Sequence, residues 1–336
     1  MLLPLLFMTL LSLCVSAQSS QQFLDSAVAK ANRKDYAKAI TDLNKAIELD
    51  PNDTDAYVNR GMINAEIFRD YQGSIKDFTK AIELSPKNVT AYSDRGVSKY
   101  NIKDYNAAMN DYNKAIEIDP KHEPAYLNRG NLKATLNDYD GSLSDFNTAI
   151  GLDSNDKKAY LNRGIVKADL KDFHGAIIDY TKAIQIDGSY IKAYIYRGNA
   201  KSDIAQYGDA IEDYNKAIKL DPQNPEPYCN IGIVRTKIKD HKEAIMYFNY
   251  AINVDSNLAD VYFAKATEEL FIHDYKEAIK DFSSVIRINP RDALAYYKRG
   301  SAKFFFGQNE SGCADFLKAK ELGFSEASEQ IGKNCR

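Results

Sequence analysis

The chain has 336 residues, 44% of them hydrophobic, so it is long enough to bury a substantial core in two globular domains or one elongated array. Its 44 Lys and Arg residues nearly balance its 47 Asp and Glu residues, for a net charge of −3. This balance excludes the global basic field that attracts nucleic-acid phosphates, so no nucleic-acid partner is expected. With 23 tyrosines and no tryptophan, the composition indicates one aromatic position that is filled repeatedly.

The first 17 residues, MLLPLLFMTLLSLCVSA, contain no charged side chain and are fewer than the ~20 residues of a membrane-spanning helix. Small residues before Gln18 allow cleavage, so residues 1–17 are predicted to be a signal peptide, although the usual basic leader is missing. The alternatives are an uncleaved anchor and a lipoprotein signal ending at Cys14, and only these would attach the protein to a membrane. We therefore expect an exported protein that is periplasmic, envelope-associated or secreted.

A short phrase recurs at a fixed period through the rest of the chain. AYLNRG occurs at Ala125–Gly130 and again at Ala159–Gly164, 34 residues apart. Its last position, called the landmark below, is occupied nine times by a small residue, at Ala27, Gly61, Gly96, Gly130, Gly164, Gly198, Gly232, Ala266 and Gly300. The step is 34 residues except for one of 35, whose extra residue is expected in the loop near Phe68 and Arg69. Such a period is typical of a repeat array.

Each period is predicted to contain two helices. The first half carries an aromatic residue four positions before the landmark, as in Tyr126 and Gly130. In the second half an aromatic and an alanine recur three apart, as in Tyr112 and Ala115, which is helical spacing. Proline, serine or glycine follows the second half in eight periods and ends the helix there.

These residues resemble the tetratricopeptide-repeat family over nearly the whole chain after residue 17. In that family a small residue in the first helix, and a small residue, an aromatic and an alanine in the second, let paired helices pack closely; here they are Gly96, Ala108, Tyr112 and Ala115. The resemblance implies an all-α fold, a right-handed superhelical solenoid of about nine 34-residue helix-turn-helix repeats in residues 18–322. Each hairpin of such an array is buried only against its neighbours, so the ends need caps.

The resemblance also implies that the first helices line a concave groove. In this family the groove residues lie three before, one after, and four to five after the landmark. These positions and their neighbours in the middle repeats are Leu127, Asn128, Asn131, Lys158, Leu161, Asn162, Lys192, Ile195 and Asn199. We expect the aliphatic side chains to contact apolar groups of a partner and the asparagine amides to bind its extended backbone. The alternative is that asparagine is merely tolerated on an exposed helix face.

The same positions become aromatic or aliphatic toward the C-terminus. They are Phe263, Leu270, Phe271, Tyr297, Phe304 and Phe305. We predict that they form one apolar patch, and such patches usually mark a contact. The contact is with a partner, with the C-terminal cap, or with a second copy of the chain.

An arginine precedes the landmark where the family usually has an apolar residue. It recurs as Arg60, Arg95, Arg129, Arg163, Arg197 and Arg299. The second helix regularly has an aspartate before its aromatic residue, so Arg129 is predicted to contact Asp145 of its own hairpin or Asp111 of the preceding one. The alternative is an arginine that extends its charge into solvent. Repeat seven replaces both residues, with Ile231 and Tyr247, whereas repeat one keeps Asp42 opposite Ser26.

Residues 323–336 are predicted to form a C-terminal capping helix, with Gly323 ending the last repeat helix and Ser325 as N-cap of the new one. Helices running from Cys313 to Leu322 and back to Cys335 return the two sulfurs to one level. An exported protein meets an oxidising compartment, so we predict a Cys313–Cys335 disulfide, with two free cysteines as the alternative. Exported bacterial repeat proteins have similarly placed cysteines.

No catalytic constellation is visible. The 4 histidines lie in or beside turns without a partner at metal-ligand or triad spacing, and the glycines do not form a phosphate-binding cluster. We therefore expect no enzyme activity, no cofactor and no metal. The sequence predicts a non-enzymatic interaction scaffold of the cell envelope or extracellular space that binds a protein or peptide in its groove. The alternative is a structural protein that self-assembles through the C-terminal aromatic patch, and the expected state is a monomer or weak homo-oligomer.

Overall fold

Tight turns of one backbone conformation separate the two helices of each repeat. The residue before the N-cap of the second helix has a positive φ; these residues are Lys34, Arg69, Lys103, Asn137, Lys171, Ala205, Lys239, His273 and Gly307. An aspartate usually caps the second helix; Asp104, for example, accepts a hydrogen bond of 3.2 Å from the backbone N–H of Ala107. The chain therefore reverses at the same point of every period.

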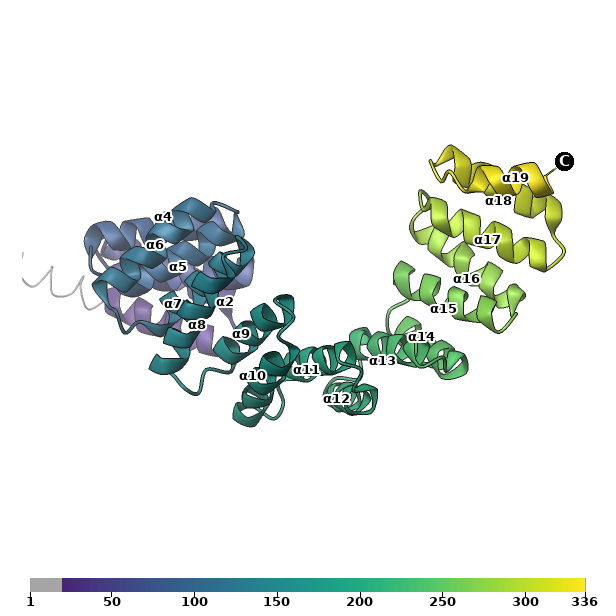
Figure 1. Cartoon of the computed structure of the whole chain (residues 1–336). Helices are drawn as coiled ribbons and strands as arrows, with labels where there is room; N and C mark the ends of the chain where they lie inside the picture. Colours follow the sequence, from purple (N-terminus) through teal and green to yellow (C-terminus); the bar gives the residue numbers. More distant parts are fainter. Residues whose placement is uncertain (1–19, 336) are drawn as a thin grey trace, which may run out of the picture. The chain divides into compact units, whose positions relative to one another are not determined.

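The computed structural model describes residues 20–335, in which there are helices and loops and no strand (Figure 1). The predicted signal peptide, residues 1–17, lies outside the described residues. The first described segment is helical over residues 20–32. The following helices are α2 (Tyr36–Leu49), α3 (Thr54–Ile63), η1 (Asn64–Phe68), α4 (Tyr71–Leu84), α5 (Val89–Asn101), α6 (Tyr105–Ile118), α7 (Glu123–Thr135), α8 (Tyr139–Leu152), α9 (Lys157–Asp169), α10 (Phe173–Ile186), α11 (Ile191–Asp203), α12 (Tyr207–Leu220), α13 (Pro225–Lys237), α14 (His241–Val254), α15 (Ala259–Phe271), α16 (Tyr275–Ile288), α17 (Ala293–Phe305), α18 (Asn309–Glu321) and α19 (Ala327–Asn334). Between residues 20 and 335 they form nine successive pairs followed by α19, so the expected all-α repeat fold is confirmed.

The landmark glycines let the second helix of each hairpin pack its aromatic ring directly against the first helix. A Cβ atom on Gly96 would lie 2.5 Å from Cε1 of the buried Tyr112, and one on Gly198 would lie 2.6 Å from Cε1 of Tyr214. Ala115, three residues after Tyr112, is also fully buried. The ring therefore fills the space that the missing side chain leaves.

The extra residue of the 35-residue period lies in a helix. The sequence placed it in the loop near Phe68 and Arg69, but the loop keeps its usual conformation, with Arg69 at φ 55° before the N-cap Asp70. Instead, α3 continues into the single π-helical turn η1, which takes up one more residue than an α-helical turn. The prediction of a loop insertion was therefore wrong.

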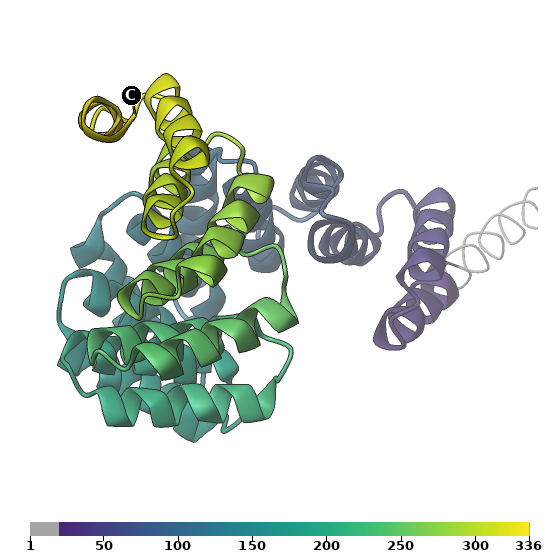
Figure 2. The same cartoon turned by 90° about the vertical axis from the view of Figure 1, so that its right-hand side faces the viewer.

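The chain divides into two units, one ending at Val166 and one beginning at Lys167, and each is described by itself. At the end of the second unit, α19 packs on α18 (yellow in Figure 2). Gly323 has a φ of 97° after α18, as expected for a residue that ends a helix. The predicted N-cap Ser325 was wrong, because α19 begins at Ala327 with Glu326 as its N-cap, while the Ser325 hydroxyl contacts the Glu326 carboxylate. The structure pairs Cys313 with Cys335, whose Cα atoms are 5.6 Å apart.

Candidate functional site

An arginine–aspartate pair joins the two helices of most repeats. Arg129 donates two hydrogen bonds to Asp145, from Nε to Oδ2 at 2.8 Å and from Nη2 to Oδ1 at 2.7 Å. The predicted pair within one hairpin is therefore confirmed. The alternative partner Asp111 is bound by Arg95 in the same way. The guanidinium of Arg129 also lies 5.5 Å from the centre of the Tyr126 ring. The chemistry of the repeated phrase is therefore structural.

The remaining guanidinium nitrogen, Nη1, reaches the second helix of the preceding repeat. In Arg129 it donates to Oδ1 of Asn113 at 2.7 Å. The same bond joins Arg60 to Asn44, Arg95 to Thr79, Arg163 to Asn147, Arg197 to Thr181, and Arg299 to Ser283. Each of these arginines thus connects two successive repeats and sets their register.

The two irregular repeats follow the same chemistry. In repeat seven, Ile231 is buried and packs in an apolar cluster with Tyr247, so an apolar contact replaces the ion pair. In repeat one, Asp42 is bound by Lys30, one turn further along the first helix than Ser26. A carboxylate at this position therefore still has a cationic partner.

The groove residues expected in the middle repeats have different environments. Leu161 and Ile195 are 4% and 2% exposed, so the prediction that they contact a partner was wrong; both belong to the packing between helices. The asparagine amides bind one another between repeats, from Asn162 Nδ2 to Asn131 Oδ1 at 2.8 Å. Asn199 Oδ1 similarly accepts hydrogen bonds from Asn230 and from the Tyr214 hydroxyl. Lys192 and Lys158 are exposed.

The C-terminal aromatic residues do not form one exposed patch. Phe263 packs edge-on against Phe282, and Leu270 belongs to the same buried cluster. The ring centroids of Tyr297 and Phe324 are 4.8 Å apart. Phe324 belongs to the predicted cap segment, just before α19, so this is the predicted contact with the cap. Phe304 stacks on Phe316. Only Phe271 and Phe305, 63% and 69% exposed, are largely accessible among the six predicted residues.

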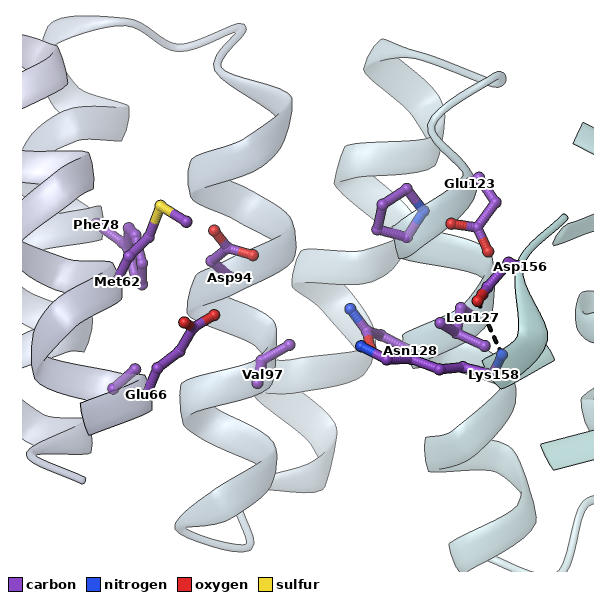
Figure 3. A pocket seen from close by; sticks show the side chains of 12 residues that line it. Met62, Glu66, Phe78, Asp94, Val97, Glu123, Leu127, Asn128, Asp156 and Lys158 are labelled. Atoms are coloured by element: carbon purple, nitrogen blue, oxygen red, sulfur yellow. Dashed lines mark hydrogen bonds between the residues drawn. The ribbon is translucent and has the colours of Figure 1, made fainter. Parts of the chain in front are cut away.

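A hollow of about 500 Å³ lies on the first-helix face of repeats two to five, within the first unit. Its residues come from α3, η1, α4, α5, α7 and the start of α9. They are Met62, Ala65, Glu66, Phe78, Asp94, Val97, Glu123, Pro124, Leu127, Asn128, Asp156 and Lys158. Figure 3 shows Glu66 and Asp94 close together on one side and Glu123 with Asp156 on the other. Three of the predicted groove residues, Leu127, Asn128 and Lys158, thus lie here.

The hollow combines an apolar wall with an excess of carboxylates. Four acidic side chains line it with only one lysine, Lys158. Burial raises the pKa of Asp94 to about 6, and the nearby Glu66 carboxylate adds to the effect. Burial raises the pKa of Glu123 to about 7, and the charge of Asp156 acts in the same direction. Near neutral pH the site therefore holds poorly solvated carboxylates that a cation would stabilise.

Sequence reasoning missed the acidic half of this hollow although the necessary signal was present. Met62, Glu66 and Val97 occupy the same positions relative to their landmarks as the predicted groove residues. The predicted groove covers repeats four to six and the C-terminal repeats, and these three residues continue it into repeats two and three. Glu123 and Asp156 lie before the regular positions, and only the structure places them at the hollow.

The part of the chain that the structure describes adds little that points to other chemistry. In residues 20–335 no cluster of His, Cys, Asp and Glu side chains is arranged to hold a metal ion. Over the same residues no helix is long and apolar enough to span a bilayer. Cys229 is the free cysteine of this region, and burial raises the pKa of its thiol to about 11, which disfavours the reactive thiolate.

Family models for the repeat match most of the array. Models described as TPR repeat or tetratricopeptide repeat match residues 30–67, 54–88, 89–122, 127–191, 206–239 and 225–258. The chain belongs to the tetratricopeptide-repeat family. Proteins built of tetratricopeptide repeats are generally non-catalytic scaffolds that bind proteins or peptides. No curated protein matches the sequence of this tetratricopeptide-repeat protein.

Two solved structures support the fold, and a third is similar over part of the chain. A tetratricopeptide repeat protein from Parabacteroides merdae is 18% identical, with a TM-score of 0.57, over 75% of this chain and 99% of that one. PilF of Pseudomonas aeruginosa is 17% identical, with a TM-score of 0.53, over 63% of this chain and 97% of that one. YrrB, described as a TPR protein with an unusual peptide-binding site, is 23% identical, with a TM-score of 0.48, over 56% of this chain and 97% of that one.

Proposed function

We propose that this tetratricopeptide-repeat protein is a non-enzymatic scaffold whose first-helix face in repeats two to five binds a basic segment of a protein partner. The carrying observation is the hollow in which Asp94 and Glu123 are partly buried beside Glu66 and Asp156. A lysine or arginine side chain fits this lining, because its charge would compensate the carboxylates. Its aliphatic stem would lie along Met62 and the other apolar side chains of the hollow.

The predicted signal peptide supports a location outside the cytoplasm. Residues 1–17 form an uncharged apolar segment with small residues before Gln18. We accordingly propose that the scaffold acts in the cell envelope or the extracellular space. Fractionation of cells that express the full chain tests this location, and recovery of the protein only in the cytoplasm would contradict it.

Selection of peptides tests the binding site. A random peptide library is selected on the full chain and on the Asp94→Asn, Glu123→Gln double variant. Asparagine is already present at the position of Asp94 in four other repeats, so the double variant is expected to fold. We expect enrichment of lysine or arginine on the native chain and a loss of affinity of about tenfold or more in the variant, about 1.4 kcal/mol.

The matched control is Glu83→Gln, which neutralises an exposed carboxylate on the second helix of repeat two. This variant should bind the selected peptides like the native chain. Enrichment of peptides without basic residues, or undiminished binding by the double variant, would contradict the proposed site.

Binding of one selected peptide should also depend on pH. The raised pKa values of about 6 for Asp94 and about 7 for Glu123 mean that acid neutralises the two carboxyls. We expect the affinity for the basic peptide to rise as the pH increases from about 5.5 to about 7.5, measured by fluorescence anisotropy at constant ionic strength. In the double variant this rise should be largely lost.

A second candidate function is self-assembly through the C-terminal repeats. The observation in its favour is the exposure of Phe271 and Phe305, 63% and 69% respectively. Light scattering over a range of protein concentrations tests it. A mass that increases with concentration in the native chain and not in a Phe271→Ala, Phe305→Ala variant would support self-assembly, and a constant monomer mass would oppose it.

A further inference from the structure

The contact between successive repeats has a regular apolar composition. In four of these contacts the first residue of the second helix packs with an aliphatic residue of the next repeat, two positions after its landmark, whereas repeat three has the buried Ser98 at that position. The two residues of each such pair belong to one apolar cluster. The pairs are Tyr36 and Ile63, Tyr105 and Leu132, Tyr139 and Val166, and Tyr207 and Val234. These contacts contain no group that changes charge near neutral pH.

The contact between repeats seven and eight replaces both partners with ionisable side chains. The aromatic position is His241, at the start of α14, and the aliphatic position is Glu268, on α15. His241 Nδ1 lies 2.6 Å from Oε2 of Glu268, which is only 3% exposed. The ring of Phe271 stacks on the imidazole with a centroid distance of 5.2 Å. A buried polar pair thus stands where four other contacts are apolar.

The next residue departs from the pattern as well. Position 269 is glutamate, whereas six other repeats have a lysine three residues after the landmark, namely Lys30, Lys99, Lys133, Lys167, Lys201 and Lys303. Glu269 is 3% exposed and shares Lys265 with Asp281 of α16: the lysine Nζ lies 3.3 Å from Glu269 Oε1 and 2.7 Å from Asp281 Oδ2. Repeat eight therefore buries three carboxylates beside one lysine and one histidine.

We propose that the contact between repeats seven and eight is a pH-sensitive joint, which is tightest in mild acid and loosens as the pH rises from about 5 to about 8. The joint lies between α14 and α15, inside the second unit. The acidic hollow, in contrast, lies in the first unit.

The direction follows from the two departures. The buried Glu268 carboxylate has the imidazole of His241 as its hydrogen-bond partner, and a carboxylate buried in this way is fully compensated only by a charged partner. Burial and the charge of Asp281 raise the pKa of Glu269 from 4.5 to about 8. A carboxyl with a raised pKa stabilises the folded state below its unfolded value, and this contribution is lost as the pH rises through the folded value. The Glu269 carboxyl, whose partners lie on α15 and α16, therefore weakens the packing of α15 toward alkaline pH, and α15 is the helix that carries Glu268 at the joint.

Other charged groups near the joint are already engaged. Arg235, on the neighbouring α13, binds Glu243 of α14 at 2.7 Å. Asp274, the N-cap of α16, accepts the backbone N–H of Glu277 and adds to the negative charge around Glu269. Lys265 is the cation that faces both Glu269 and Asp281. These neighbours therefore leave the three carboxylates in excess.

Hydrogen exchange of the full chain tests the proposal. Protection of α14 and α15 is measured at about pH 5.5 and about pH 8.5, each corrected for the intrinsic exchange rate. We expect protection to fall by at least about tenfold at the higher pH, the change that corresponds to one pKa unit. The internal control is the contact between α12 and α13, which contains Tyr207 and Val234 and should show no such fall.

Two variants locate the effect. The first is the triple variant His241→Tyr, Glu268→Val, Glu269→Lys. It restores the composition of the regular contacts and should therefore remove the pH dependence. The second is the double variant Glu268→Gln, Glu269→Gln, which keeps the size of the side chains and the hydrogen bond to His241. It should also remove the pH dependence, and it serves as the test if the triple variant does not fold. Equal protection at both pH values in the native chain, or a persistent fall in the folded variants, would overturn the proposal.

Discussion

At the scale of single residues, the aromatic ring of the second helix explains why the first helix has a glycine at the landmark, because the ring packs directly on that position. Gly96 lies in the middle of α5, where glycine is a poor helix former. Tyr112 occupies the space of the missing Cβ, so the cost in helix propensity is offset by the burial of a large aromatic ring. The same arrangement recurs at Gly130 with Phe146 and at Gly232 with Phe248.

Gly96→Ala should therefore destabilise the array. The new Cβ would lie 2.5 Å from the Tyr112 ring, which is fully buried and cannot move freely. We expect a loss of about 1–3 kcal/mol in the free energy of unfolding, as is usual for overpacked cores. Urea denaturation followed by circular dichroism measures it.

Gly151→Ala is the matched control, since Gly151 lies in α8 with no atom within 4 Å of its ideal Cβ. Alanine should be neutral there or stabilise by at most about 0.5–1 kcal/mol. An equal loss at both glycines would show that the ring contact does not explain the glycine.

The arginine–aspartate pair shows how far sequence reasoning reaches at this scale. The pair of Arg129 and Asp145 could be predicted because repeat seven lacks the arginine and the aspartate at the equivalent positions. Helical spacing also placed the two residues on facing sides of their helices. The burial of Leu161 and Ile195 could not be predicted in the same way. Their register was known, but burial depends on how closely neighbouring helices approach, and no single repeat encodes that distance.

At the scale of helices, the π-helical turn η1 carries Glu66, one of the carboxylates that line the hollow. An inserted residue in the tight loop would have disturbed the left-handed residue and the N-cap that all the repeats share. The helix accommodates the insertion instead, and Ala65 and Glu66, which belong to this turn, line the hollow. The period of 35 was visible in the sequence, but the choice between loop and helix rests on the constant geometry of the turn.

Deletion of Ile67 should convert η1 into an ordinary α-helical turn. Ile67 is 41% exposed, so little core packing is lost and the chain should remain folded. Because the deletion changes the register of the helix end, we expect Glu66 to leave the hollow and binding of the selected basic peptides to weaken by a few fold. Circular dichroism and fluorescence anisotropy measure the two effects. Native affinity in the folded deletion variant would show that the turn does not serve the hollow.

At the scale of the whole molecule, an open array must end in a cap. The last repeat presents α18, and α19 covers it. The pair Cys313 and Cys335 joins the two helices across a sequence separation of 22 residues. The cap and the cysteine pairing were predictable because equal helix lengths on either side of a turn return the chain to the same level. The hollow was only half predictable, because it is assembled from four repeats whose side chains differ.

Reduction of the disulfide should loosen the C-terminal end. Loss of a cross-link of this loop length costs about 3 kcal/mol, and the effect falls on α19 first. Hydrogen exchange and limited proteolysis of the native chain, with and without reductant, measure the opening of α19. Cys313→Ser should behave like the reduced protein, whereas Cys229→Ser, which changes the free cysteine, should have no effect on α19. Equal protection of α19 in oxidised and reduced protein would contradict a stabilising role.

The arginine contacts between repeats also predict how the protein would respond to force. Where Arg129 and its equivalents reach back to the preceding repeat, pulling the chain ends apart must break a charged hydrogen bond as well as apolar packing. Repeat seven has Ile231 at this position, and in repeat eight Lys265 binds Asp281 of its own hairpin. Under tension, the two contacts on either side of repeat seven therefore resist without an arginine bond. Lys237 with Ser202 and His241 with Glu268 are polar contacts there, so the bonds that oppose pulling differ from one repeat to the next within the second unit.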